Sequence, residues 1–263
     1  MTANPASVSR SMKLRDKVSP EEWQVRVDLA ACYRLVAYYD MTDLTFTHIS
    51  ARIPGQPDHF LLNPFGMMFE EITASSLVKT HMDGTIDKDS PYEYIPAGYT
   101  IHSGVLAARP DVQCVLHTHT SAGMAVSSLE CGLLPMTQTA LRFHNNIAYH
   151  DYEGVALDLD ERGRLARDLG KHQSMILKNH GLLTTGRSIA EAFVLMHRLE
   201  KACKAQLEAL ATGQKPIALS EEVKEHTAKQ FNGMHLSNGP IYGDREWPSL
   251  CRMMDRVDPS YKM

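Results

Sequence analysis

The sequence predicts a single α/β domain in which strands and helices alternate along the chain. Its 263 residues are 43% hydrophobic and 22% charged, which is enough apolar surface for one sizeable core. Short β-rich stretches are interleaved with longer stretches in which apolar residues recur at helical spacing. A tight-turn signal at Asp83-Gly84 lies among the early β-rich stretches, which favours antiparallel pairing there.

The first predicted element is a helix that begins at Ser19 and runs to about Tyr39. Ser19, Pro20 and Glu22 have the pattern of a capping box with proline at the first helical position. Three β-rich stretches follow, and we expect antiparallel strands over residues 44–53, 59–66 and 77–87. A helix is then expected over residues 97–111, ended by Pro110.

Strands and helices are also predicted to alternate in the second half of the chain. We expect a short strand over 114–119, helices over 120–130 and 160–171, and a strand over 174–186 interrupted near Gly181. Ser188 and Glu191 form a second capping box, which opens a long amphipathic helix that stops at Gly213. The last predicted helix covers 219–233, before a polar tail over 244–263.

No internal repeat or linker divides the chain. We therefore expect an N-terminal arm over residues 1–18, one domain over 19–214, and a C-terminal helical tail over 215–263. The tail is expected to pack on the body of the domain or on a neighbouring subunit.

Composition excludes several classes of function. A formal net charge of -4 gives no reason to expect nucleic acid or an anionic membrane as partner. The five cysteines are widely spread and include no CxxC pair, which argues against a disulfide framework and a cysteine-ligated metal. The N-terminus lacks the apolar core of a secretory signal, and no apolar run reaches the roughly 20 residues of a membrane span. A cytoplasmic protein is expected.

Two histidines separated by one residue end the apolar run at 114–119. Because side chains alternate across a strand, His117 and His119 should point to the same face, where their imidazoles can converge on one ion. Two ligands are too few for a metal site. His180 is a candidate third ligand, since the glycine after it relaxes the backbone of an interrupted strand. The alternative for each histidine is a hydrogen-bonded structural role.

Longer stretches carry a family resemblance, and they occur in a fixed order. CVLHTHTSAGMAVS is followed by CGLLP, AYHDYEG, ILKNHGLLTTG and IAEAFVLMHRLEKAC. Upstream, LTFTHISARI, LLNPFGMMFEEITASSLVK and GYTIHSGVLAARPDV extend the match. From about Pro20 to Gly213 the chain therefore resembles the class II aldolase/adducin family, and it looks like an adducin head that stands alone.

The resemblance implies a fold, a metal and an assembly. The fold is a single three-layer α/β/α domain with a central, mainly antiparallel sheet, usually assembled as a homotetramer with sites near subunit boundaries. Enzymes of the family bind one divalent metal, usually zinc, at the positions that are His117, His119 and His180 here. Imidazole also suits Mn²⁺, Fe²⁺ and Co²⁺. Three nitrogens leave a coordination position open for an oxygen of a small-molecule substrate.

The sequence departs from the sugar-phosphate aldolases of that family at their acid/base. Those enzymes place a glutamate a few residues before the histidine that is His102 here, and the matching residue is Gly98. General acid-base catalysis contributes about 10²- to 10⁴-fold, so ordinary aldol chemistry needs a substitute. The candidate proton carriers are His144, Tyr149, His150, Tyr152, Glu70 and Glu71. For each of them, surface exposure or packing is the alternative.

A second departure concerns the substrate phosphate. Family aldolases hold it with a Gly-Asn turn and a serine pair, where this chain has Thr47-His48 and Pro96-Ala97. A phosphorylated sugar is therefore not expected. Thr47, His48 and Asn63 could instead bind a carboxylate or hydroxyl of the substrate.

These observations leave three functional hypotheses. The first is a metal-dependent carbon–carbon lyase that cleaves a small, non-phosphorylated carbonyl or hydroxy-acid compound through a metal-stabilised enolate. The second is a decarboxylase of a hydroxylated aromatic, heteroaromatic or other acid, because loss of carbon dioxide does not require the missing glutamate. The third is a non-catalytic interaction module like the adducin head, although the chain has no basic C-terminal cluster like the adducin tail.

Overall fold

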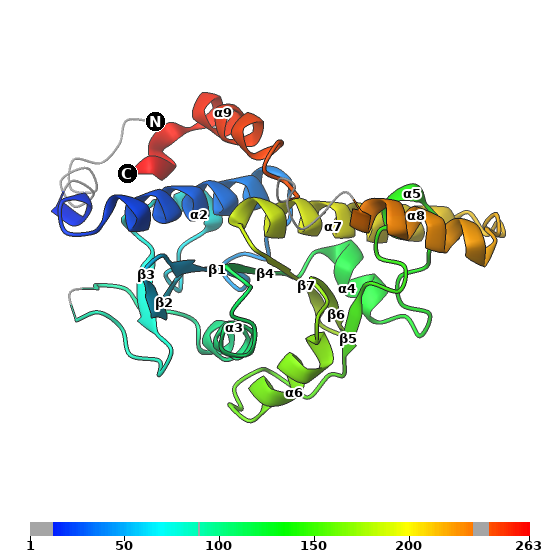
Figure 1. Ribbon diagram of the computed structural model, residues 1–263, viewed down its shortest axis with the longest axis horizontal. Coiled ribbons are helices and arrows are strands. Elements are labelled where there is room, and N and C mark those ends of the chain that lie inside the picture. The colour runs from blue at the N-terminus through cyan, green and yellow to red at the C-terminus, as the bar shows by residue number, and fades with distance from the viewer. Residues whose placement is uncertain (1–12, 89, 234–241) are drawn as a thin grey trace.

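A computed structural model describes residues 13–88, 90–233 and 242–263 of the chain. Within these residues, seven strands form one sheet in the order β3-β2-β1-β4-β7-β6-β5 (Figure 1). The strands are β1 (His48–Ile53), β2 (Gln56–Leu62), β3 (Val78–His81), β4 (Cys114–Thr118), β5 (Ala148–His150), β6 (Ser174–Leu177) and β7 (Gly181–Gly186). Neighbouring strands are antiparallel except β5 and β6, which are parallel. The expected mainly antiparallel sheet is confirmed.

Helices cover both faces of this sheet (Figure 1). One face packs against α2 (Pro20–Tyr38) and α7 (Ile189–Ala211), and the other against α3 (Pro96–Ala108) and α6 (Glu161–Leu169). The remaining helices are η1 (Phe69–Glu71), α4 (Ser121–Ser127), α5 (Gln138–Leu141), α8 (Glu221–Gly233), α9 (Trp247–Val257) and η2 (Pro259–Lys262). The three-layer α/β/α architecture is therefore confirmed as well.

Side chains of the central strand β4 alternate between two hydrophobic cores. Cys114 and Leu116 belong to the core under α2 and α7, whereas Val115 belongs to the core under α3. Because the side-chain period of a strand is two, His117 points to the α3 side with Val115. In the adjacent strand β1, Ile49 packs toward α2 and α7. His48 therefore shares the α3 side with His117.

The two long helices begin as their sequences predict. The Ser19 hydroxyl accepts a hydrogen bond from the Glu22 amide at 3.1 Å, and the Ser188 hydroxyl accepts one from the Glu191 amide at 3.1 Å. The Glu22 side chain does not complete the capping box, because it forms ion pairs with Arg26 at 2.9 Å and with Lys79 at 3.0 Å. That carboxylate therefore joins α2 to β3.

The structure differs from the sequence prediction at several elements. The stretch predicted as one interrupted strand is a hairpin of β6 and β7. The short elements α5 and β5 and the helix α9 were not predicted, and α9 lies within the supposed polar tail. Trp247 Nε1 donates to Asp28 Oδ1 at 3.1 Å, and Arg34 pairs with Asp258 at 2.9 Å, so residues 242–263 pack on α2.

Residues 1–12 of the expected N-terminal arm lie outside the described residues. Across the described segments, no helix has the length and apolar character needed to cross a bilayer.

Candidate metal centre

Three imidazoles meet at the end of the sheet where β4 stops and β7 starts. His117 is in β4, His119 lies one residue beyond its end, and His180 is in the turn between β6 and β7. The antiparallel register places Thr118 opposite Leu182, so that turn lies beside the end of β4. His119 is thus not on the strand as predicted, but its side chain still joins the other two.

The imidazole nitrogens of these residues, which we call the histidine triad, face one another. His119 Nε2 lies 2.8 Å from His117 Nε2 and 3.0 Å from His180 Nε2. His117 Nδ1 donates to the Leu182 carbonyl at 2.9 Å, which leaves a lone pair on its Nε2. His119 Nδ1 lies 3.0 Å from Asp43 Oδ2, which leaves a lone pair on its Nε2 in the same way. Facing lone pairs repel, and a shared cation removes that repulsion, so this donor set fits a divalent metal.

The Asn-His-Gly turn explains how His180 reaches the triad. Asn179 adopts a left-handed conformation with φ of 56°. A Cβ atom on Gly181 would lie 2.4 Å from the Thr118 carbonyl oxygen, closer than any side chain permits. Glycine at 181 therefore lets the turn approach the end of β4, and this approach brings His180 beside His119.

Burial keeps two imidazoles of the triad ready to bind a cation. Desolvation, together with the neighbouring imidazoles, lowers the pKa of His117 well below its ordinary value. The same causes lower the pKa of His180 to about 4. Both rings are therefore neutral near pH 7, which is the protonation state that a metal requires of an imidazole ligand.

Two members of the triad, His119 and His180, line a cavity of about 270 Å³. The residues that line it are Asp43, Phe46, His48, Ile95, Ala97, Ile101, His119, Tyr152, Gly154, Val155, Ala156 and His180. Most of these side chains are apolar, and no lysine or arginine is among the described residues of the lining. A bound cation would thus face a space with one carboxylate, two further polar groups and an apolar wall.

Comparison with known proteins identifies the family of the chain. The family model for the class II aldolase and adducin N-terminal domain matches residues 27–207. The chain belongs to this family. It is 51% identical over 246 residues to a candidate aldolase class 2 protein of Pseudomonas aeruginosa, which covers 94% of this chain and 95% of that protein. Mouse alpha-adducin is 40% identical over 244 residues, which are 89% of this chain but 33% of the adducin.

Two solved structures of the family extend the comparison. An aldolase II superfamily protein from Pseudomonas syringae superposes with a TM-score of 0.90 at 48% identity, covering 95% of this chain and 100% of that chain. The L-fuculose 1-phosphate aldolase from Glaciozyma antarctica PI12 superposes with a TM-score of 0.78 at 28% identity, covering 92% and 93%. The fold is therefore shared by an aldolase II superfamily protein and by a named sugar-phosphate aldolase.

Gly98, where the resemblance predicts the position of the family glutamate, lies against the ring of His48. A Cβ atom at Gly98 would come within 2.9 Å of His48 Cδ2 and 2.9 Å of Ile95 Cγ2. The space beside Gly98 is therefore already filled by the side chains of His48 and Ile95. The imidazole of His48, which lines the cavity, packs directly on the backbone of α3 at that point.

The other predicted substrate-binding residues lie behind this cavity. Thr47 and Asn63 are both fully buried, and neither side chain is among the cavity lining. Asn63 Oδ1 accepts a hydrogen bond from the Tyr33 hydroxyl at 2.9 Å, and its Nδ2 lies 3.5 Å from the Thr47 carbonyl. Their contacts fix the backbone at the start of β1, directly before His48.

Two of the predicted proton carriers lie away from the lining. The Tyr149 hydroxyl accepts a hydrogen bond from the Leu133 amide at 3.1 Å, and its ring packs on the core under α2 and α7. His144 Nε2 lies 2.6 Å from Glu221 Oε1 of α8. These contacts indicate structural roles in binding neighbouring segments together.

His150 and Tyr152 lie nearer to the triad. His150 is buried at the end of β5, where its Nδ1 lies 2.7 Å from Asp168 Oδ2. Tyr152 lines the cavity, and its ring centroid lies 6.5 Å from that of His180. Of the sequence candidates for proton transfer, Tyr152 is therefore placed where it can contact a substrate.

Sequence reasoning missed Asp43, which orients His119, and the apolar wall of the cavity. Asp43 precedes β1 in a loop without regular structure, and no motif or spacing marks it. Phe46 and Val155 are strongly exposed, at 48% and 70%. In the sequence, the one available signal was the presence of large apolar residues in these loops, and the structure shows that they are exposed beside the cavity.

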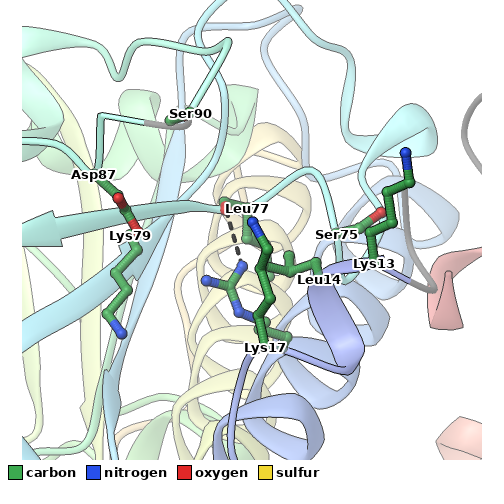
Figure 2. A pocket seen from close by; sticks show the side chains of 9 residues that line it. Lys13, Leu14, Lys17, Ser75, Leu77, Lys79, Asp87 and Ser90 are labelled. Carbon is green, nitrogen blue, oxygen red and sulfur yellow. Dashed lines mark hydrogen bonds between the residues drawn. The ribbon is translucent and has the colours of Figure 1, made fainter. Parts of the chain in front are cut away.

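A second cavity, of about 150 Å³, lies where the segment before α2 meets β3 (Figure 2). Its lining includes the basic residues Lys13, Lys17, Arg26 and Lys79. Glu22 forms ion pairs with Arg26 and Lys79, and Figure 2 shows the side chains of Lys13 and Lys79 extending in different directions. Their charges do not converge on one point, so the triad cavity remains the candidate active site.

Proposed function

We propose that the protein is a divalent-metal-dependent carbon–carbon lyase with His117, His119 and His180 as the metal ligands. The convergence of three imidazole Nε2 atoms at the mouth of a cavity supports this proposal above all. A bound divalent cation, most simply Zn²⁺, would supply a Lewis acid that stabilises the negative charge of an enolate. Asp43 and the Leu182 carbonyl hold two of the ligand rings in the orientation that this requires.

The substrate that we propose is a small, non-phosphorylated carbonyl or hydroxy-acid compound. A phosphate dianion needs donors, and the described lining of the cavity offers neither lysine nor arginine. The imidazole of His48 is buried, and desolvation lowers its pKa well below the ordinary value, so it is neutral near pH 7. The described lining therefore supplies no lysine or arginine for a phosphate, whereas its apolar wall suits an uncharged substrate body.

Decarboxylation of a hydroxylated aromatic, heteroaromatic or other acid is the alternative within the lyases. It is favoured by Gly98, because no carboxylate base stands at the position where the family aldolases carry one. An assay of the zinc-loaded protein with a panel of hydroxy-carboxylates, aromatic acids and aldol products distinguishes the two. Aldehyde release supports aldol cleavage, carbon dioxide release supports decarboxylation, and turnover of neither kind contradicts both.

Metal analysis tests whether the three histidines bind a metal, which both lyase proposals require. Elemental analysis of the purified protein should find close to one divalent metal per chain, and the variants His117→Ala, His119→Ala and His180→Ala should lose it. A wild-type protein that remains metal-free after incubation with Zn²⁺ would overturn the assignment of the ligands.

A non-catalytic interaction module is the alternative of another class. The 40% identity with mouse alpha-adducin, over most of this chain but a third of the adducin, favours it. Absence of metal binding in the same metal analysis supports the interaction module. Turnover of a compound in the substrate panel supports a lyase.

We further propose that the protein is a cytoplasmic homotetramer with each cavity near a subunit boundary. Large apolar side chains are exposed on the loops around the cavity, among them Leu44, Phe46, Val155, Leu157 and Leu159. Burial of such a patch between subunits would stabilise an assembly. The five cysteines are all free, as expected in a reducing compartment. Light scattering coupled to size-exclusion chromatography tests the assembly, and a monomer would contradict it.

A further inference from the structure

A row of three hydrogen-bonded side chains leads from the interior of the protein to the cavity. His48 Nδ1 lies 2.8 Å from His102 Nε2, and His102 Nδ1 lies 2.5 Å from Ser50 Oγ. All three residues are buried. We call them the His48 row, and only its last member, His48, is among the described residues that line the cavity.

The partners of Ser50 determine where the protons of this row lie. Within the described residues, the Ser50 hydroxyl has no hydrogen-bond partner except His102. A buried O–H group without an acceptor is costly, so the hydroxyl donates to His102 Nδ1. His102 then carries its proton on Nε2 and donates it to His48 Nδ1. As a result, His48 carries its own proton on Nε2.

Burial of His102 supports this arrangement of protons. Desolvation lowers the pKa of His102 to about 3, so its ring is neutral and has one proton to donate, to His48. The row therefore holds the Nε2–H group of His48 fixed at the cavity. His48 Nε2 has no hydrogen-bond partner among the described residues, so this donor is available to a ligand.

The position of His48 places this donor beside the triad. His48 and His117 are directly opposite each other on β1 and β4, and their ring centroids are 5.0 Å apart. On its other side the ring occupies the space that a side chain at residue 98 would need, as shown by the 2.9 Å approach to a Cβ there. His48 thus stands between the ligand His117 and the backbone position at which the family aldolases carry their glutamate.

We infer that His48 is a catalytic residue whose Nε2–H donates a hydrogen bond to the substrate oxygen that becomes negatively charged, with His102 and Ser50 as its positioning residues. This inference rests on the proposed function, because it requires a substrate with its reacting oxygen at the triad. A preorganised donor of this kind acts without any change of protonation state, as neutral histidines do in other enzymes. It would stabilise an enolate whether the leaving group is an aldehyde or carbon dioxide.

The first test measures the tautomer of His48 directly. Protein labelled with ¹⁵N in its histidine rings and loaded with Zn²⁺ should show a His48 ring that is protonated on Nε2 and not on Nδ1. The signal is identified by its absence from the His48→Gln variant. Ser50→Ala should weaken this preference, whereas Ser50→Thr, which retains the hydroxyl, should preserve it. A His48 ring protonated on Nδ1 in the wild type would overturn the inference.

The second test measures binding of acetohydroxamate, a small chelating analogue of an enediolate, to the zinc-loaded protein by calorimetry. His48→Phe should bind it about tenfold to hundredfold more weakly, since a hydrogen bond to a charged group is lost. His48→Gln, whose amide can place an N–H group at a similar point, should recover most of the affinity. Zinc-loaded His48→Phe that binds acetohydroxamate as tightly as wild type would contradict the role of His48.

The two proposals fail in distinguishable ways. A wild-type chain that binds no zinc contradicts the proposed function. A chain that binds one zinc but shows the opposite His48 tautomer, or no effect of His48→Phe, contradicts the role of His48 alone.

Discussion

Histidines at the ends of two strands of the same sheet have different surroundings. At the end of β4, the triad has one carboxylate nearby, that of Asp43. At the end of β5, His150 Nδ1 lies 2.7 Å from Asp168 Oδ2, and its Nε2 lies 3.6 Å from Glu161 Oε1 and 3.9 Å from Glu153 Oε1. The comparison teaches that carboxylates around an imidazole decide its role. At His150 one carboxylate holds the ring by Nδ1 and two more surround Nε2, whereas in the triad Asp43 orients one ring and the three Nε2 atoms face one another.

Removal of a triad member should have the largest effect. We expect His119→Ala to lose its metal and to lower turnover by at least about 10³-fold, because an electrophile worth several kcal/mol is removed. Metal analysis and the assay that the substrate panel provides measure both effects. His226→Ala, at an exposed position of α8, is the control. Retention of one metal by His119→Ala would contradict the assignment of His119 as a metal ligand.

Loss of the carboxylate beside the triad should have the next largest effect. Asp43→Ala should weaken zinc binding by about 10- to 100-fold, because His119 loses the group that orients its ring. Competition with a fluorescent chelator measures this affinity. Asp151→Ala is the matched control, since Asp151 is an exposed carboxylate near the cavity that pairs with Lys178 at 2.6 Å. Equal losses in both variants would indicate a general charge effect in place of ring orientation.

Loss of a carboxylate beside His150 should affect stability and not the metal. Asp168→Ala leaves a buried imidazole nitrogen without its acceptor, so the free energy of unfolding should fall by about 1–3 kcal/mol. Asp168→Asn retains an acceptor oxygen and should lose less. Urea unfolding measures the change, and the zinc content should stay at one per chain. If zinc were lost from Asp168→Ala, the cluster around His150 would belong to the metal centre after all.

Acid should destabilise the metal-free protein through its buried neutral histidines. Burial lowers the pKa of His102 from 6.5 to about 3, so the unfolded chain binds a proton that the folded chain does not in this range. The contribution of His102 is complete above pH 6.5 and is lost as pH falls toward 3, at about 1.4 kcal/mol per pH unit. Urea unfolding in EDTA at pH 7, 6 and 5 measures this slope.

The variant His102→Gln provides the comparison for that measurement. Between pH 6 and pH 5, the free energy of unfolding of this variant should change less steeply with pH than that of the wild type. The difference is the contribution of one histidine. Identical slopes would show that His102 takes up a proton in the folded state.

The triad could be predicted because each part of it is local. His117 and His119 belong to one strand end, and Asn-His-Gly marks a turn wherever it meets an interrupted strand. The layered fold and the ligand assignment followed from the family resemblance. Asp43 and the apolar wall could not be predicted, because they come from loops near residues 43 and 155 that meet only through tertiary packing.

The missed elements have physical reasons of their own. With three residues in β5 and four in α5, neither is long enough to show a periodic pattern. The helix α9 has a polar sequence overall, and Met254 is its one fully buried residue. Tyr149 and His144 were candidates from their residue types and their place in the chain, and the structure shows that each is hydrogen-bonded to a neighbouring segment, outside the cavity lining.

The contact between Gly98 and His48 also restricts how this chain could change over time. A single substitution that installs glutamate at residue 98 would collide with the imidazole ring before it could assist any reaction. A glutamate at residue 98 and the present position of the His48 ring therefore exclude each other. A chain that gains the glutamate also needs a smaller or displaced side chain at residue 48.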